Sequence, residues 1–95
     1  MEIDFDSDKN EFNIAKHGYD LRLAIFVLSD PSAVTVQDTR KSYGEDRFIT
    51  IGVFGDEIVV VVVHTPRGKL TRIISMRRAN RKERKIYDAI RSIDR

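Results

Sequence analysis

Cysteine is absent from this 95-residue chain, so no disulfide can brace the fold and no thiolate can bind a metal or attack a substrate. No apolar run is longer than that at residues 58–63, which is far too short to span a bilayer. The acidic start of the chain contains no apolar segment of the kind that signal peptides carry. We therefore expect a cytoplasmic protein with no membrane partner, stabilised by its own core.

Several catalytic signatures are also missing. The sequence has no glycine-rich phosphate loop, no GxSxG nucleophile elbow, no HExxH and no CxxC. Asp4, Asp6 and Asp8 lie close in sequence, but they straddle a predicted strand-to-helix junction, where helix capping explains them at least as well as cation binding does. We expect neither a metal nor another cofactor.

Charge is unevenly distributed along the chain. Residues 1–63 hold 6 Lys/Arg and 12 Asp/Glu, a net charge of −6, whereas residues 64–95 hold 11 Lys/Arg and 3 Asp/Glu, a net charge of +8. Such an asymmetry indicates that the C-terminal part faces something acidic. That acidic surface is either a partner, such as nucleic acid or a protein, or the acidic half of the chain itself.

Hydrophobic periodicity predicts a mixture of helices and strands. A helix should begin near Asp6, end before Gly18 and bury an apolar face made of Phe12, Ala15 and Ile14. A second helix should cover residues 20–28. Asn80 is suited to cap a last helix over residues 81–93, with Ile86, Ala89, Ile90 and Ile93 on its apolar side.

Strands are predicted at residues 3–5, 34–36, 47–54, 58–63 and 70–76. The run of six β-branched residues at 58–63 indicates a central strand that is apolar on both faces. Gly55-Asp56 fits a two-residue hairpin turn, and Pro66-Arg67-Gly68 fits another tight turn. The order β-α-α-β-β-β-β-α predicts one α+β domain over residues 1–95, with an antiparallel sheet and the N-terminal and C-terminal helices packed on it.

Candidate site residues lie on or beside these strands. Arg77 and Arg78 should point to opposite faces of the last strand, where arginine suits phosphate oxygens; ordinary strand-end charge is the plainer explanation. His64 could transfer protons near neutral pH or be a hydrogen-bonded edge residue. His17 fits the negative end of a helix dipole. Glu45 beside Arg47 could be a general base or a simple ion pair.

The ordered combination of these pieces resembles the BrnT family of bacterial type II toxins. It comprises Phe5-Asp6, Lys9, Asn13, Lys16-His17-Gly18, Asp30-Pro31, Gly44-Glu45, Arg47-Phe48, Ile51-Gly52, the segment RIISMRRA at residues 72–79, Arg81, Glu83, Arg84 and Tyr87. The resemblance covers about residues 2–88. Phe5 stands where the family usually has tryptophan, and Leu21 where an aromatic residue is common.

The resemblance implies a RelE-like fold and a ribonuclease that blocks translation. It also implies neutralisation by a cognate BrnA-type antitoxin in a hetero-oligomer. The antitoxin carries a DNA-binding domain, so operator DNA would be reached only through it.

The chemistry implied is metal-independent attack of the ribose 2′-hydroxyl on the adjacent phosphate. We expect Arg47 and Arg77 to stabilise the phosphate and Glu45 or His64 to transfer protons. Lys9, Arg72, Arg78 and Arg81 would hold the RNA backbone. The alternative is a non-enzymatic module that binds nucleic acid or an acidic protein through the basic C-terminal segment.

Overall fold

Five strands form one sheet in the order β1-β5-β4-β3-β2. The computed structural model describes residues 1–40, 42 and 44–93. The strands are β1 (Glu2–Asp4), β2 (Val34–Gln37), β3 (Phe48–Phe54), β4 (Ile58–Arg67) and β5 (Leu70–Arg78). Neighbouring strands are antiparallel except β1, which pairs parallel with β5. The predicted α+β class is confirmed, with this one parallel pair added to the expected antiparallel sheet.

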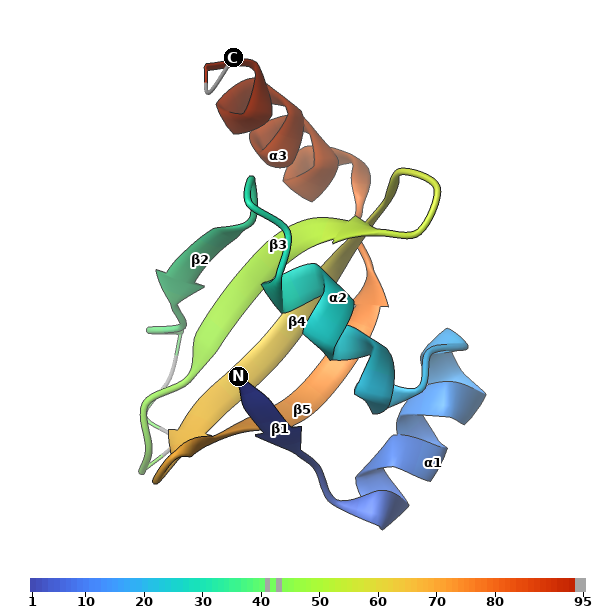
Figure 1. The fold of residues 1–95 in the computed structure, drawn as a ribbon, viewed down its shortest axis with the longest axis vertical. Coiled ribbons are helices and arrows are strands. Elements are labelled where there is room, and N and C mark those ends of the chain that lie inside the picture. Colours follow the sequence, from blue (N-terminus) through green and yellow to red (C-terminus); the bar gives the residue numbers. More distant parts are fainter. Residues whose placement is uncertain (41, 43, 94–95) are drawn as a thin grey trace.

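The helices occupy three different places around the sheet (Figure 1). They are α1 (Ser7–His17), a 3-10 turn η1 (Leu21–Leu23) that leads into α2 (Ala24–Leu28), and α3 (Arg81–Ile93). Helix α2 crosses one face of the sheet, α1 lies beside β5, and α3 projects from one end. One face of the sheet is therefore left largely open.

The central strand β4 is buried on both sides because its valines alternate between two apolar clusters. Val60 and Val62 join Leu21, Ala24 and Val27 beneath α2. On the other face, Val59 and Val61 join Ile51 and the aromatic ring of Tyr87. The six-residue β-branched run thus forms the doubly buried strand that its composition predicts.

Helix α2 lies close to β3 because residue 52 is glycine. A Cβ atom there would stand 2.9 Å from the carbonyl oxygen of Val27. Any side chain at this position would push α2 away from the sheet. The close approach allows a helix of five residues to seal the core.

Helix α1 has the predicted ends but not the predicted buried face. Asp6 caps its start and Gly18, with φ of 81°, ends it. Its buried residues are Asn10 and Asn13, whereas Phe12 is 66% exposed and Ile14 is 42% exposed. The expectation that Phe12, Ile14 and Ala15 form the buried side is wrong, because the helix meets a strand edge that needs hydrogen bonds.

That strand edge belongs to β5. Strand β1 pairs with β5 only as far as Arg72, which leaves the backbone of Met76 without a strand partner on that side. The Asn13 side chain fills this place: its Nδ2 donates to the Met76 carbonyl at 2.9 Å, and its Oδ1 accepts from the Met76 N–H at 3.1 Å. An amide side chain thus caps an edge that would otherwise bury unpaired backbone groups.

Helix α3 is attached mainly through one residue. Tyr87 is 1% exposed, and its hydroxyl donates to Asp30 at 2.6 Å. The residues predicted to form the apolar face are mostly outside the core: Ile86 is 43% exposed and Ile93 is 80% exposed. The C-terminal helix therefore extends past the sheet instead of lying flat on it (Figure 1).

Both predicted hairpin turns differ from the structure in length or position. The first connection contains three residues, 55–57, because Phe54 pairs with Ile58; Gly55 and Glu57 both adopt positive φ. The second turn lies at Gly68-Lys69, since β4 continues through Pro66 to Arg67. Proline cannot donate a backbone hydrogen bond, and Pro66 is tolerated because it lies near the end of β4, where few such bonds remain.

Candidate functional site

A groove of about 540 Å³ lies on the sheet face that α2 does not cover. Its floor consists of apolar side chains from three neighbouring strands, including Ile49 from β3, Val61 and Val63 from β4, and Ile74 from β5. Helix α1 forms one wall, and residues just before β3 contribute to the other. The groove therefore has an apolar base and walls drawn from distant parts of the sequence.

The ionisable side chains that line the groove are lysines, arginines and one histidine, which becomes a cation when it is protonated. Among the described residues no carboxylate lines it, so it would attract anions. Only one of these groups belongs to the basic segment 64–95; the others come from the half of the chain with net negative charge. They are Lys9, Lys16, His17, Arg40, Arg47 and Arg77.

A β-bulge shapes the floor. Val63 pairs with Ser75 and His64 pairs with Ile73, so Ile74 is an extra residue on β5. As a result Ile74 and Ser75 both line the groove, while Ile73 and Met76 both belong to the core beneath α2. Strict alternation would have placed Ile74 and Met76 on the same face.

Arg77 is held in a defined orientation by Glu83 in the first turn of α3. Its Nη1 and Nη2 atoms donate to the two Glu83 carboxylate oxygens at 2.8 and 2.7 Å. Glu83 is itself fixed by a capping box, because it accepts from the Asn80 N–H while Asn80 Oδ1 accepts from the Glu83 N–H. The hydrogen bonds from Arg77 lower the pKa of Glu83, which keeps this partner ionised.

The pairing leaves part of the Arg77 guanidinium available. Nη1 also donates to the Arg78 carbonyl at 3.3 Å, so among the described residues three of the five N–H groups have acceptors. The remaining two, on Nε and Nη2, lie on one side of the guanidinium and form a parallel fork. This geometry suits two oxygens of a phosphate.

His17 lies in the same groove, at the end of α1. Burial and the nearby positive charges of Lys16 and Arg77 lower its pKa, so the imidazole is largely neutral at pH 7. Sequence reasoning assigned His17 to the helix dipole alone. The signal that could have revealed it is the helical spacing of Lys9, Asn13, Lys16 and His17, which places all four toward one side of α1.

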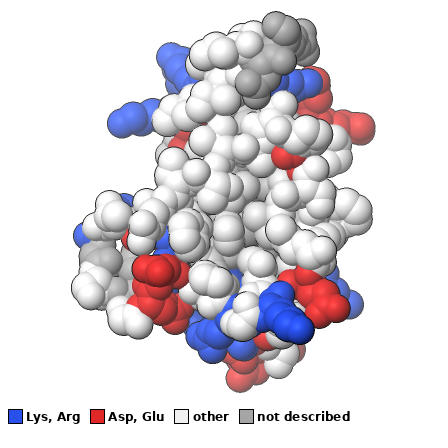
Figure 2. Space-filling model, turned by 60° about the vertical axis from the view of Figure 1, so that its left-hand side comes forward, with Lys and Arg blue, Asp and Glu red and all other residues white. Residues whose placement is uncertain are grey.

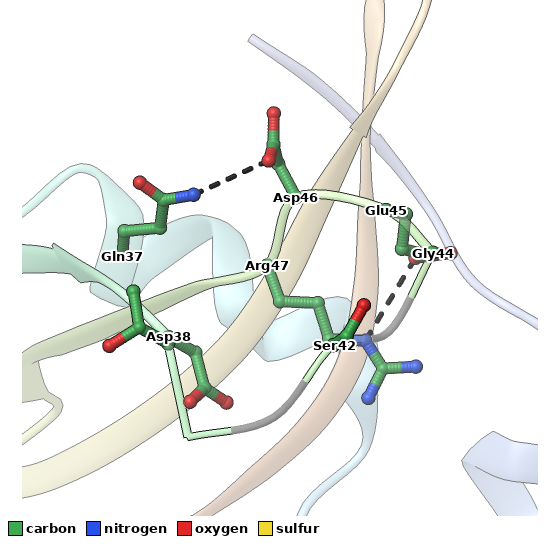
Figure 3. A pocket seen from close by; sticks show the side chains of 8 residues that line it. Gln37, Asp38, Ser42, Gly44, Glu45, Asp46 and Arg47 are labelled. Carbon is green, nitrogen blue, oxygen red and sulfur yellow. Dashed lines mark hydrogen bonds and ion pairs between the residues drawn. The ribbon is translucent and has the colours of Figure 1, made fainter.

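Arg47 and Glu45 stand at the opposite end of the groove. Arg47 lines the groove, but Glu45 lines only the two adjacent hollows, where it forms ion pairs with Arg47 at 3.9 Å and with Arg67 at 3.5 Å. Figure 3 shows the larger hollow, which Asp38, Glu45 and Asp46 line; Glu45 pairs with Arg47, and Asp46 points toward Gln37. Three carboxylates make that hollow unsuitable for a phosphate.

His64 occupies the other face of the sheet. It is in register with Phe48 and stacks on that ring at 6.1 Å, and its Nε2 lies 2.7 Å from the Thr50 hydroxyl. Val62, two residues earlier, belongs to the core under α2, and alternation places His64 on that side. The structure therefore separates His64 from Arg47 and Arg77, with which the sequence had grouped it.

The predicted backbone-binding residues are divided among several surfaces. Lys9 lines the groove and the small hollow next to it, and Arg72 lines that hollow while pairing with Asp4 at 3.8 Å. Arg78 is exposed at the end of β5, on the opposite side from Arg77, as alternation predicted. Arg81 is exposed at the start of α3 and does not line the groove.

The outer surface elsewhere is more mixed. In Figure 2 charged side chains gather toward the two ends, and uncharged ones fill the middle.

Within residues 1–40, 42 and 44–93, no three histidine, aspartate or glutamate side chains form a group that could hold a metal ion. None of the helices in the described part of the chain is long and apolar enough to cross a membrane.

The fold and groove together define a class of protein: a small α+β domain with one open, cationic sheet face that suits a polyanion. A family model narrows this class. The model for the ribonuclease toxin BrnT of type II toxin–antitoxin systems matches residues 5–83. The chain therefore belongs to the BrnT family of ribonuclease toxins, and membership implies an RNA substrate and an antitoxin partner.

A solved structure supports the same assignment. The chain is 33% identical to the Brucella abortus ribonuclease toxin BrnT, known from a crystal structure at 1.1 Å resolution, with a TM-score of 0.66. The match covers 85% of this chain and 99% of the Brucella chain. A comparison with curated proteins gave no match.

Proposed function

We propose that the cationic groove is the site of RNA cleavage and that the reaction requires no metal ion. The ribose 2′-oxygen attacks the adjacent phosphorus, the bond from phosphorus to the 5′-oxygen breaks, and the products are a 2′,3′-cyclic phosphate and a 5′-hydroxyl. Such a reaction needs a base that takes the 2′-hydroxyl proton, a donor that gives a proton to the departing 5′-oxygen, and fixed positive charge for the transition state. The groove offers the base and the positive charge, and solvent water supplies the proton for the 5′-oxygen.

The observation that carries this proposal is the orientation of Arg77. Glu83 holds the guanidinium from one side, and the Nε–H and second Nη2–H remain for a phosphate. Because the fork is fixed before substrate arrives, little reorganisation is needed as charge develops on the phosphate oxygens. Arg77 would therefore stabilise the transition state, with Glu83 as its positioning residue.

His17 is the proposed general base. Its pKa is lowered, so the neutral form that accepts a proton from the 2′-hydroxyl predominates at pH 7. His17 lines the groove together with Arg77, so a phosphate held by Arg77 would lie on the same surface as the imidazole. His17 thus replaces Glu45 and His64, the proton-transfer candidates chosen from sequence, which do not line the groove.

Arg47 is suited to a second phosphate further along the same RNA chain. Arg77 pairs with Val61, and Val61 pairs with Ile51, which lies four residues beyond Arg47. At the rise of a β-strand, the two arginines enter the groove about 13 Å apart along the strand direction. Lys9 lines both the groove and the small hollow together with Arg47. Arg40 lines the groove close enough to Arg77 for their charges to interact. Arg72 adds a further cation in the small hollow.

At the level of the cell, this activity would block translation in the cytoplasm until an antitoxin binds. The antitoxin is expected to be BrnA-type, to form a hetero-oligomer with the toxin, and to carry the domain that contacts operator DNA. These expectations rest on family membership. The groove itself supplies no separate argument for a DNA substrate, and DNA lacks the attacking 2′-hydroxyl.

The test is cleavage of a 5′-labelled single-stranded RNA by the purified protein in EDTA. We expect products with cyclic-phosphate ends, and no cleavage where the scissile ribose is replaced by 2′-deoxyribose. Loss of cleavage in EDTA with recovery on adding Mg²⁺ would contradict the metal-independent reaction. Tight, salt-sensitive binding without any cleavage would instead support the non-enzymatic module.

A further inference from the structure

The exposed phenylalanine on α1 lies at the edge of the groove. Phe12 is 66% exposed and is among the residues that line the groove. Exposing an aromatic ring is unfavourable, and a helix of this kind would normally turn it toward the core. Here the buried positions are taken by Asn10 and Asn13, so the packing of the fold gives no reason for a phenylalanine at position 12.

The surroundings of Phe12 indicate what covers it. Lys9, Phe12 and Lys16 are spaced at i, i+3 and i+7, which aligns them along one side of α1, and all three line the groove. The Lys16 ammonium lies over one face of the Phe12 ring, 5.7 Å from its centre, so a base would stack on the other face. The ring is therefore flanked along the helix by cations that repel a basic partner and attract phosphates.

We propose that Phe12 is a stacking platform for one nucleobase of single-stranded RNA. The inference rests on the proposed function of the groove and adds a base contact to it. Phosphates bound by Lys9 and Lys16 would bring the adjoining base over the ring, and stacking on an aromatic side chain is a general means of holding single strands. Base-paired RNA would bind poorly because its bases are already stacked and paired.

The first experiment measures binding of a short fluorescein-labelled RNA of mixed sequence, made with 2′-O-methyl riboses so that it is not cut. Phe12→Ala and Phe12→Leu should each weaken binding about 5- to 150-fold, whereas Phe12→Trp should bind at least as well as wild type. Leucine separates the aromatic face from apolar surface. Phe12 is exposed, so all three variants should keep the wild-type urea midpoint.

Phe26→Ala is the matched control. Phe26 is 59% exposed, but it lies on α2 against Phe54, on the covered side of the sheet. It should leave RNA binding unchanged. Equal loss in Phe26→Ala and Phe12→Ala would overturn the proposal, because the effect would then reflect general loss of exposed apolar surface.

A second experiment identifies the stacked base. A series of the same RNA, with an abasic site at each position in turn, is bound to wild type and to Phe12→Ala. We expect one position whose base strengthens binding to wild type but not to the variant. If every abasic RNA affects the two proteins alike, or if Phe12→Ala binds as tightly as wild type, the proposal is wrong.

These results distinguish failure of the proposed groove function from failure of the stacking role of Phe12. If wild type neither binds nor cuts RNA, the proposed function of the groove fails. If wild type binds and cuts RNA but Phe12→Ala is indistinguishable from it in both assays, the function stands and the stacking role is overturned.

Discussion

The two faces of the sheet are built from alternate residues of the same strands, yet one face is buried in the core and the other forms an open groove. Under α2, Val60, Val62 and Ile73 are sealed in a continuous core. On the reverse, Val61, Val63 and Ile74 form the floor of an open groove edged by cations. The difference lies in the helices: α2 covers its face with apolar residues, whereas α1 reaches the sheet edge with amides and leaves the other face accessible.

The largest effect is expected at the neighbouring arginines that alternate between these faces. Arg77→Ala should reduce RNA cleavage about 100- to 1,000-fold, because it removes fixed charge from the transition state. Arg78→Ala, one residue further on β5 and pointing to the opposite face, should have little effect. Single-turnover rates of the two variants provide the measurement, and equal losses would contradict the assignment of one face to catalysis.

The next effect concerns stability at the edge where α1 meets the sheet. Asn13→Ala leaves the buried N–H and carbonyl of Met76 without partners, so the free energy of unfolding should fall by about 2–4 kcal/mol. Ile14→Ala, at an exposed neighbouring position, should change it by less than about 0.5 kcal/mol. Urea unfolding measures both, and a larger loss in the isoleucine variant would restore the conventional apolar face of α1.

The pH dependence of cleavage should report His17. The base is active when neutral, so activity should rise as pH increases through the His17 pKa and reach a plateau above it. Because that pKa is lowered from 6.5, the midpoint should lie below 6.5. Lys16→Ala removes one of the charges responsible and should move the midpoint upward, even if binding also weakens. An unchanged midpoint would exclude His17 as the titrating group.

The smallest effect on activity is expected for His64. His64→Ala removes the contact with the Thr50 hydroxyl and should cost about 1 kcal/mol of stability. Cleavage at a temperature where the variant is folded should be unchanged, since His64 lies on the face away from the groove. A severe loss of rate with an intact fold would return His64 to the catalytic set.

The sequence predicted the elements well because their signals are local. The valine run of β4, the Asp6 and Asn80 caps and the Gly18 helix end each depend on residues within a few positions of one another. What it could not predict is how α1 contacts the sheet. The Asn13 bonds to Met76 span 63 residues, and nothing in the helical periodicity distinguishes an amide that caps a strand edge from a solvated one.

The candidate site was predicted in part for the same reason. Simple alternation along β5 predicts that Arg77 and Arg78 point to opposite faces, and the structure confirms this placement. The same alternation puts His64 on the side of Val60 and Val62, but the sequence does not show that Arg47 and Arg77 lie on the other face. Charge counting pointed to the basic C-terminal segment, but most cations of the groove come from the acidic half, because the fold brings them together on one face.

A methyl NMR titration with the uncleavable 2′-O-methyl RNA shows which face of the sheet the RNA contacts. The methyl groups of Ile49, Val63 and Ile74 should shift, because they form the groove floor, while those of Val60, Val62 and Ile73 should remain unperturbed beneath α2. These residues alternate on shared strands, so each shifted signal has its own internal control. Shifts confined to the α2 side, or to α3 alone, would contradict the placement of RNA in the groove.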